Sequence, residues 1–255
     1  MRNKLIYCGL MSLSLAASSC SSGYRITGFE RSRILVDSTS DATPDKDVAD
    51  FITPYRQHVD SIMSPVVGRT ACYMSASRPE STLSNLLADI LIWCGKDYDE
   101  RPDFAVYNMG GIRSAFAKGD VTYGDVLDVA PFENKICFLT LTGDKVLELF
   151  AQIAATGGEG VSHGVELRIT NDGRLKSARL NGGEIITGKK YRVATLDYLA
   201  QGNDNLTAFK ASTDVKSPQS KDNNVRFIIM RYMKEKMNQG MEVESRIEGR
   251  IKTEN

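Results

Sequence analysis

Apolar residues spaced three and four positions apart predict four amphipathic helices, because that spacing gathers them on one helical face. These helices are expected over residues 48–63, 82–93, 144–155 and 225–237. Ser81 and Thr82 can cap the second helix and Gly95 is expected to end it, while Asn224 is expected to cap the last. Pro54 lies inside the first pattern and lacks the N–H that a helix interior uses. We therefore expect a separate turn there, followed by a helix that begins at Pro54 with Thr53 as its cap.

Shorter apolar runs predict strands at 65–76, 103–107 and 136–141, and a weaker run at 32–36 predicts one more. Residues 164–195 are expected to form hairpins, since Asn171-Asp172-Gly173 and Asn181-Gly182-Gly183 supply turns that need positive φ. Helices mixed with hairpins indicate the α+β class. We expect one such domain over residues 46–255.

The first residues differ from the rest and resemble an export signal. Arg2 and Lys4 precede an apolar stretch that is too short to span a membrane, and small residues follow it. Cys20 at its end resembles the lipidated cysteine of bacterial lipoproteins, although Ala17 departs from the usual Leu. We expect a signal peptide over 1–19, a polar tether over 20–45, and an exported protein, lipid-anchored in a bacterial outer membrane or facing the periplasm.

Charge and cysteine content narrow the classes further. Removal of residues 1–19 leaves 30 basic and 32 acidic residues, so the mature chain has no basic excess of the kind that nucleic-acid binding requires. Cys72, Cys94 and Cys137 are widely spaced and form no C-x-x-C pair. Buried free thiols are the favoured interpretation, and one disulfide with one free thiol is the alternative.

The side chains that usually carry hydrolytic chemistry are scarce. His58 and His163 are the only histidines of the chain, and no H-E-x-x-H, G-x-S-x-G or Walker-type motif occurs. A dimetal centre normally draws on several histidines and carboxylates. The residues alone therefore predict a binding domain with no metal site and no catalytic residue.

One segment combines glycines with polar groups directly after a predicted buried strand. Asn108-Met109-Gly110-Gly111-Ile112-Arg113 reads either as a turn with a surface Arg or as a ligand site. Glycine permits close approach to another group, while Asn and Arg are suited to binding polar ligand atoms.

A collinear set of motifs extends this segment and resembles the C-terminal domain of the 5'-nucleotidase and UDP-sugar hydrolase family. Asn108–Arg113 is similar to the family's N-x-G-G-I-R. Similar motifs occur in the family's order at Pro79–Asp89, Gly119–Thr122, Ala130–Asn134, Leu141–Gly143 and Leu196–Asp204. The resemblance implies a layered α/β/β/α single domain that binds the base and ribose of a nucleotide.

The resemblance also assigns roles to particular residues. Two aromatic rings that sandwich the base correspond to Phe132 and Tyr198, and the Asp that accepts the ribose hydroxyls corresponds to Asp204. Asn108 and Arg113 correspond to the family residues that contact the base edge and the ribose or phosphate oxygens. Gly110 and Gly111 are expected to keep side-chain bulk away from the ligand.

Two departures from the family pattern affect these assignments. Asn203 replaces the second glycine of the G-G-D motif, and we expect Asn there because it tolerates positive φ. A family arginine upstream of the helix-opening motif has no clean counterpart, since Arg78 is near but Pro79 occupies the position.

The family's metallophosphatase motifs are not found, and the expected tether is too short to replace that domain. The sequence hypothesis is therefore a nucleotide-recognition half of a split 5'-nucleotidase, with divalent metals held by a separate metallophosphatase chain. The alternatives are a nucleoside- or nucleotide-binding lipoprotein without a catalytic role and a degenerate scaffold that has lost its ligand.

Overall fold

The structure is a computed structural model that describes residues 25–35, 37–39 and 44–254. Cys20 and the expected signal peptide lie outside these residues. The chain divides into two compact units, residues 1–52 and 53–255. In the smaller unit, residues 25–35 form neither helix nor strand, so the strand predicted at 32–36 is not found in the described part of that segment.

The first helix, α2 (Lys46–Met63), continues through Pro54, so the predicted break at Pro54 is wrong. Proline removes the N–H that would bond the Asp50 carbonyl. None of the residues of α2 is buried, and water can satisfy that carbonyl instead. No helix in the described part of the chain is both long and apolar enough to cross a bilayer.

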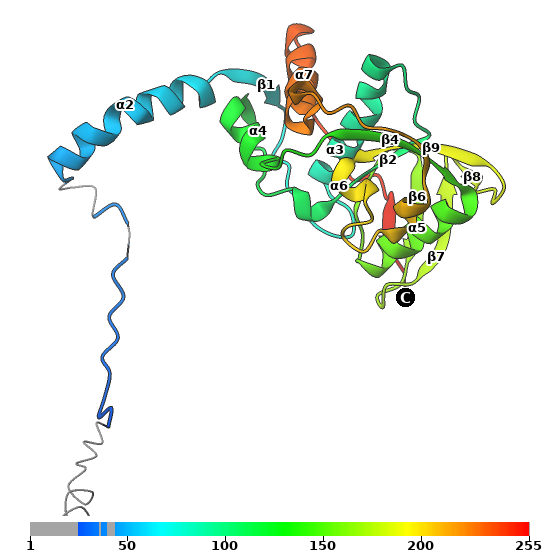
Figure 1. The fold of residues 1–255 in the computed structure, drawn as a ribbon, viewed down its shortest axis with the longest axis horizontal. Helices are drawn as coiled ribbons and strands as arrows, with labels where there is room; N and C mark the ends of the chain where they lie inside the picture. The colour runs from blue at the N-terminus through cyan, green and yellow to red at the C-terminus, as the bar shows by residue number, and fades with distance from the viewer. Residues whose placement is uncertain (1–24, 36, 40–43, 255) are drawn as a thin grey trace, which may run out of the picture. The chain divides into compact units, whose positions relative to one another are not determined.

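The larger unit is built on a five-stranded mixed sheet with the order β10-β4-β9-β2-β5. Figure 1 labels its three central strands, β4, β9 and β2. Its strands are β10 (Thr213–Lys216), β4 (Ile136–Thr142), β9 (Lys190–Leu196), β2 (Phe104–Tyr107) and β5 (Gly160–Val161). β9 pairs in parallel with β2 and antiparallel with β4. Every residue of β2 is buried, as expected for a central strand that is covered on both faces.

Two of the predicted helices pack against this sheet. α3 (Thr82–Trp93) contacts β2 and β5, and α5 (Gly143–Ala155) contacts β4 and β9. The rings of Phe104 and Phe150 meet between β2 and α5, with centroids 5.2 Å apart. The predicted cap of α3 is confirmed, because the Ser81 side chain accepts a hydrogen bond from the N–H of Ser84.

The end of α3 differs from the prediction. A 3₁₀ helix, η2 (Cys94–Tyr98), follows directly, and the left-handed residue that ends it is Asp99 rather than Gly95. Gly95 instead packs tightly against the backbone of Glu100, since a Cβ at this position would lie 2.7 Å from the Glu100 carbonyl oxygen.

The cysteines of the larger unit are all free thiols. Cys94 and Cys137 are buried and Cys72 is half-buried.

The other two sheets of the described residues are smaller. One has the order β11-β6-β7-β8 and contains β11 (Ile251–Thr253), β6 (Val165–Ile169), β7 (Leu175–Leu180) and β8 (Gly183–Glu184). The β7–β8 turn is confirmed, with positive φ at Asn181 and Gly182. The other pairs β1 (Val66–Thr70) with β3 (Gly119–Thr122), and α7 (Val225–Asn238) packs on β1 (Figure 1).

The mixed α and β single domain predicted from the sequence is confirmed. The Asn224 cap of α7 is also confirmed, since its side chain accepts from the Arg226 N–H. A short helix, α4 (Tyr123–Val129), was not predicted, although Thr122 and Asp125 form a capping box at its start. The sequence signal was present, but α4 spans only seven residues.

The strand pairings bring three loops to one edge of the five-stranded sheet. β2 and β9 run in parallel, so the residues after Tyr107 and after Leu196 emerge at the same edge. β4 runs against β9 with Ile136 opposite Leu196, so the segment before β4 starts from that edge as well. Open sheets with parallel strands commonly bind ligands at the carboxyl ends of those strands.

Candidate functional site

The turn after β2 is shaped around the side chain of Asn108. Its residues Met109–Gly111 form the 3₁₀ helix η3. Asn108 is only 4% exposed. A Cβ at Gly111 would lie 2.6 Å from the Asn108 Oδ1 atom, so glycine is required there for close approach. Gly110 is exposed and borders the solvent side of the turn. Neither glycine has positive φ.

The Asn108 amide is satisfied on one side only. Its Nδ2 atom donates to the Asp204 Oδ2 atom at 2.8 Å. Its Oδ1 atom is buried and has no hydrogen-bond partner among the described residues. Buried polar atoms are nearly always paired, so an unpaired acceptor at a loop edge is a candidate ligand contact.

Asp204 is held by two donors from separate loops. The Tyr198 hydroxyl donates to Oδ1 at 2.9 Å, while Asn108 binds Oδ2. This hydrogen bond to Asp204 raises the pKa of Tyr198. Asp204 lies in the left-handed region with φ 54°.

Asn203, by contrast, has no positive φ, so the expected reason for Asn at this position is wrong. Its side chain instead donates to the Tyr198 carbonyl oxygen at 2.7 Å. Asn203 therefore braces the loop that carries the tyrosine.

Two aromatic rings border a cavity at this edge. Phe132 is 47% exposed and Tyr198 is 37% exposed, which is unusual for large apolar rings. The cavity has a volume of about 190 Å³. Its lining residues come from all three loops, namely Asn108, Gly110, Phe132, Asn134, Tyr198 and Asp204. We call these six residues the sheet-edge pocket.

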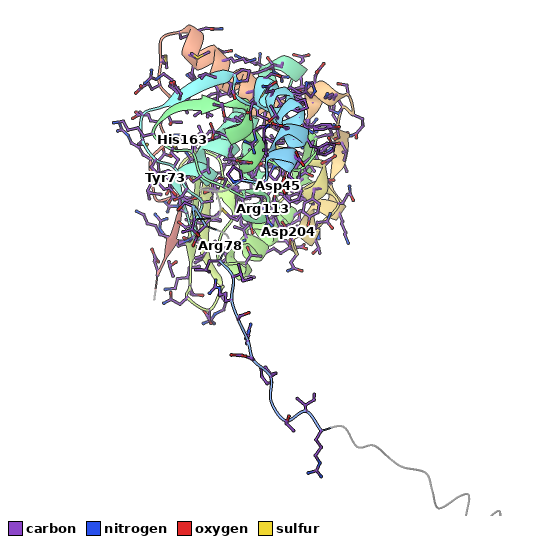
Figure 2. The ribbon with its side chains drawn as sticks, turned by 90° about the vertical axis from the view of Figure 1, so that its left-hand side faces the viewer. Asp45, Tyr73, Arg78, Arg113, His163 and Asp204 are labelled. Atoms are coloured by element: carbon purple, nitrogen blue, oxygen red, sulfur yellow. The ribbon has the colours of Figure 1, made fainter. Side chains whose placement is uncertain are left out.

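Arg113 lies at the border of the pocket without lining it. Its Nη1 atom donates to the Gly110 carbonyl oxygen at 3.2 Å. The guanidinium carbon lies 5.8 Å from the centre of the Phe132 ring, within range of a cation–π contact. The side chain is exposed, and Figure 2 labels it together with Asp204. Arg113 is therefore an exposed positive group next to the Asn108 turn.

Arg78 pairs with Glu159, which does not line the sheet-edge pocket. Its Nη2 atom donates to the Glu159 Oε1 atom at 2.5 Å, and its Nε atom donates to the Gly158 carbonyl oxygen at 2.8 Å. The other carboxylate oxygen of Glu159 accepts from the Met109 N–H at 2.5 Å. Glu159 is buried, and burial raises its pKa. Glu159 thus links Arg78 to the Asn108 turn through the Met109 N–H.

Sequence reasoning missed two residues of this candidate site and its surroundings. Asn134 was quoted within the P-F-x-N motif but was not predicted to belong to the site. Glu159 had no signal beyond the preceding glycines, because its bond to Met109 joins residues 50 positions apart.

Among the described residues, no three or more His, Cys, Asp or Glu side chains gather closely enough to hold an ion. His58 lies on the exposed α2, and His163 pairs with Glu248 at 2.9 Å.

Comparison with known proteins gives a consistent family signal. The family model for the 5'-nucleotidase C-terminal domain matches residues 66–211. A 5'-nucleotidase of Vibrio parahaemolyticus is 28% identical over 167 residues, which are 64% of this chain and 30% of the relative. Protein UshA of Escherichia coli is 25% identical over 169 residues, covering 65% and 31%. This chain therefore spans about a third of the length of these two relatives.

Solved structures agree on the fold. The 5'-nucleotidase precursor of Thermus thermophilus superposes with a TM-score of 0.70 at 26% identity, covering 84% of this chain and 45% of that one. The NAD nucleotidase of Haemophilus influenzae gives a TM-score of 0.60 at 21% identity, over 82% and 41%. The second likeness bears on the fold alone.

Proposed function

Since this chain belongs to the family of 5'-nucleotidase C-terminal domains, we propose that it is the nucleotide-recognition half of a split 5'-nucleotidase. A separate metallophosphatase chain would hold the metals and hydrolyse the phosphate ester. The observation that carries the proposal is the sheet-edge pocket. It combines two exposed rings, a carboxylate, and a buried amide oxygen that has no hydrogen-bond partner among the described residues.

The chemistry of the pocket suits a nucleoside. Each base has two π-faces, and stacking on aromatic side chains contributes about 1–3 kcal/mol per base. Phe132 and Tyr198 supply such rings, and Asp204 supplies acceptors for sugar hydroxyls. The exposed guanidinium of Arg113 offers a partner for phosphate oxygens.

A second feature supports a protein partner. The part of α2 that belongs to the larger unit exposes Val59 and Ile62, which are three residues apart and therefore share a helical face. Exposed apolar side chains in such an array favour contact with another protein surface.

Two measurements test the proposal. Calorimetry with adenosine and AMP reports binding by this chain alone. Phosphate release from AMP is then measured with metallophosphatase chains of the same genome, with and without this chain. We expect binding in the first experiment and a change in rate or substrate preference in the second.

Matched variants separate the two roles. Phe132→Ala should weaken adenosine binding about 10- to 100-fold and reduce the effect on the partner in parallel. A Val59→Asp/Ile62→Asp double variant should bind adenosine normally and lose the effect on the partner. Absence of nucleoside and nucleotide binding would overturn the whole proposal. Binding with no effect on any phosphatase would favour the capture lipoprotein instead.

Export and lipid anchoring at Cys20 are part of the same proposal. Labelling of cells with radioactive palmitate should mark the wild-type chain in the membrane fraction. A Cys20→Ala variant should remain unlabelled. Equal labelling of both chains, or of neither, would contradict the anchor.

A further inference from the structure

The carboxylate of Asp204 is fixed at both oxygens by neighbouring side chains. The Tyr198 hydroxyl donates to Oδ1 at 2.9 Å, and the Asn108 amide donates to Oδ2 at 2.8 Å. The two donors come from different elements, α6 (Asp197–Ala200) and the turn after β2. Rotation of the carboxylate would break at least one of these bonds, so its plane is set before a ligand arrives.

Two acceptor positions remain on the carboxylate. An ionised carboxylate offers about four lone-pair positions. Tyr198 and Asn108 use one on each oxygen, which leaves one on each. A vicinal diol carries two hydroxyl donors on adjacent carbons and can use both remaining positions at once, in hydrogen bonds strengthened by the charge.

We propose that the Tyr198 hydroxyl positions Asp204 for a vicinal diol and thereby sets a preference for ribonucleosides over 2'-deoxyribonucleosides. This inference rests on the proposed function of the sheet-edge pocket. The tyrosine then has two separable roles. Its ring borders the cavity where a base stacks, and its hydroxyl orients the group that binds the sugar.

A phenylalanine at this position separates the two roles. Tyr198→Phe keeps the ring and removes only the donor to Asp204. The Asp204 Oδ1 atom is then no longer held by a donor. The second hydroxyl of a diol consequently meets an acceptor whose position is not fixed. A 2'-deoxyribose has only one hydroxyl on those two carbons, so its binding depends less on a fixed plane.

The test compares adenosine with 2'-deoxyadenosine by calorimetry on the full chain. We expect the wild type to bind adenosine more tightly. Tyr198→Phe should weaken adenosine binding about five- to tenfold, the size of one ordinary hydrogen bond. The affinity for 2'-deoxyadenosine should change by less than about twofold. Tyr73→Phe, an exposed tyrosine outside the pocket, is the matched control and should change neither affinity.

A double variant shows whether the hydroxyl acts through Asp204. Asp204→Asn removes the charge and one acceptor, and Asn tolerates the left-handed backbone at this position. In that background, adding Tyr198→Phe should change the adenosine to 2'-deoxyadenosine ratio by less than about twofold. An equal loss for both nucleosides, no loss for either, or the same change of ratio in the Asp204→Asn background would overturn the inference alone. Failure of the wild type to bind any nucleoside would instead overturn the proposed function.

Discussion

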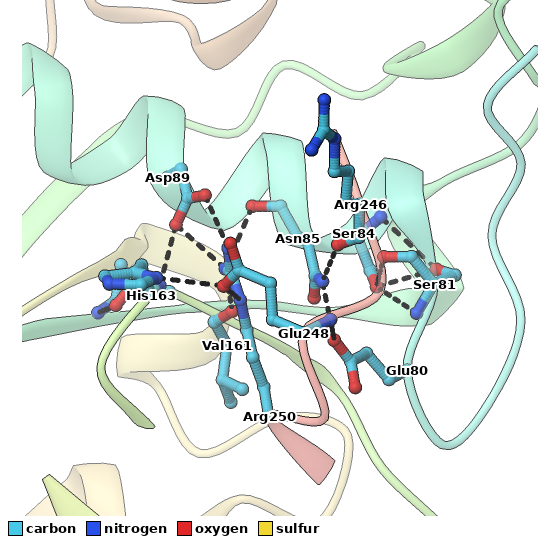
Figure 3. Close-up of polar contacts among 12 residues, drawn as sticks. Glu80, Ser81, Ser84, Asn85, Asp89, Val161, His163, Arg246, Glu248 and Arg250 are labelled. Atoms are coloured by element: carbon cyan, nitrogen blue, oxygen red, sulfur yellow. Dashed lines mark hydrogen bonds and ion pairs between the residues drawn. The ribbon is translucent and has the colours of Figure 1, made fainter. Parts of the chain in front are cut away.

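Two polar regions of the larger unit differ in how completely their hydrogen bonds are made. The first is the sheet-edge pocket. The second, which we call the Arg250 network, joins Arg250 to α3, to β5 and to Glu248, which in turn contacts His163 (Figure 3). Arg250 is 3% exposed, and all three of its guanidinium nitrogens donate. Their acceptors are the Asp89 carboxylate, the Glu248 carboxylate and the Val161 carbonyl oxygen, all at 2.7–2.9 Å.

The pocket lacks this completeness. The Asn108 Oδ1 atom is buried without a partner among the described residues, while two rings that could have been buried remain in contact with solvent. Both features cost free energy in the unliganded protein. A buried acceptor has lost its hydrogen bond to water, and an exposed ring leaves apolar surface in contact with water. Arg226 Nε and Arg231 Nε are also buried without a partner among the described residues, so an unpaired atom alone does not mark a ligand site. The contrast lies in the combination at the pocket, where an unpaired acceptor, two exposed rings and a cavity occur together.

The Arg250 network also shows how the C-terminal segment, which follows the matched family region, is attached to the rest of the domain. Glu248 and Gly249 donate their backbone N–H groups to the Glu80 carboxylate, and Arg250 lies just before β11. These bonds fasten the C-terminal segment to the start of α3. The segment therefore completes the domain, although the family model ends at residue 211.

The largest expected effect is loss of stability when Arg250 is removed. Arg250→Met keeps much of the side chain's volume but leaves the Asp89 and Glu248 carboxylates without their buried partner. Breaking a buried ion pair typically costs 3–5 kcal/mol, and we expect about 3 kcal/mol because both carboxylates keep some contact with water. Urea denaturation measures the loss, and the adenosine affinity of the folded protein should not change.

Arg246→Met is the matched control for this change. Arg246 lies on the same segment, and its exposed side chain pairs with the exposed Glu244 at 3.1 Å. We expect less than about 0.5 kcal/mol there. The comparison between the two regions breaks if both variants lose equal stability, or if Arg250→Met alters the affinity for adenosine.

The next effect concerns the pocket and has the opposite pattern. Phe132→Ala removes one stacking surface, so adenosine binding should weaken about 10- to 100-fold, which corresponds to ~1–3 kcal/mol. The free energy of unfolding should change by less than about 1 kcal/mol, since the ring is half exposed already. Calorimetry and urea denaturation measure the two quantities, with Tyr73→Ala as an exposed aromatic control. A large loss of stability with intact binding would show that Phe132 belongs to the core.

Sequence reasoning predicted the elements whose signals are local. The Ser81 and Asn224 caps and the Asn181-Gly182 turn depend on neighbouring residues, and all three are confirmed. The break at Pro54 was wrong because its cost depends on exposure, which the local pattern does not contain. An exposed helix can leave one carbonyl to water, whereas a buried helix could not.

The sequence predicted most residues of the sheet-edge pocket but not the hydrogen bonds between them. The motif resemblance identified Asn108, Phe132, Tyr198 and Asp204, and the fold brings them to one cavity. The bond between Asn108 and Asp204 joins residues 96 positions apart, and sheet register decides whether they meet. The same holds for the hydrogen bond between the Met109 N–H and Glu159, which no short motif could indicate.

A smaller effect is expected for Glu159, and it depends on pH. Burial raises the pKa of this carboxyl above its ordinary value of 4.5, so ionisation costs more in the folded protein than in the unfolded chain. Its contribution to stability is therefore fully present below pH 4.5 and is lost as the pH rises through the raised pKa. Glu159→Gln cannot ionise and should lack this loss.

The measured quantity is the difference in unfolding free energy between wild type and Glu159→Gln across pH 4 to 8. It should move in favour of the variant as the pH rises, because burial raises the pKa of the Glu159 carboxyl and only the wild type has a group there that must ionise. Gln retains an acceptor for the Met109 N–H, so adenosine should still bind. Glu166→Gln, at an exposed position of β6, serves as the control and should show no such trend. A difference that moves the other way would mean that Arg78 outweighs burial.

The smallest effect should mark where the Arg250 network ends. The His163 ring bonds Glu248, but the His163 side chain is 78% exposed, and water competes for both partners. The tighter contact is the backbone N–H of His163, which donates to Asp89 at 2.8 Å and survives any substitution of the ring. His163→Gln should therefore change the unfolding free energy by no more than about 0.5 kcal/mol, and 1 M NaCl should reduce even that change. A loss of more than about 1 kcal/mol, independent of salt, would extend the structural network to the surface. The distinction between the two regions would then depend on which bonds are made rather than on burial.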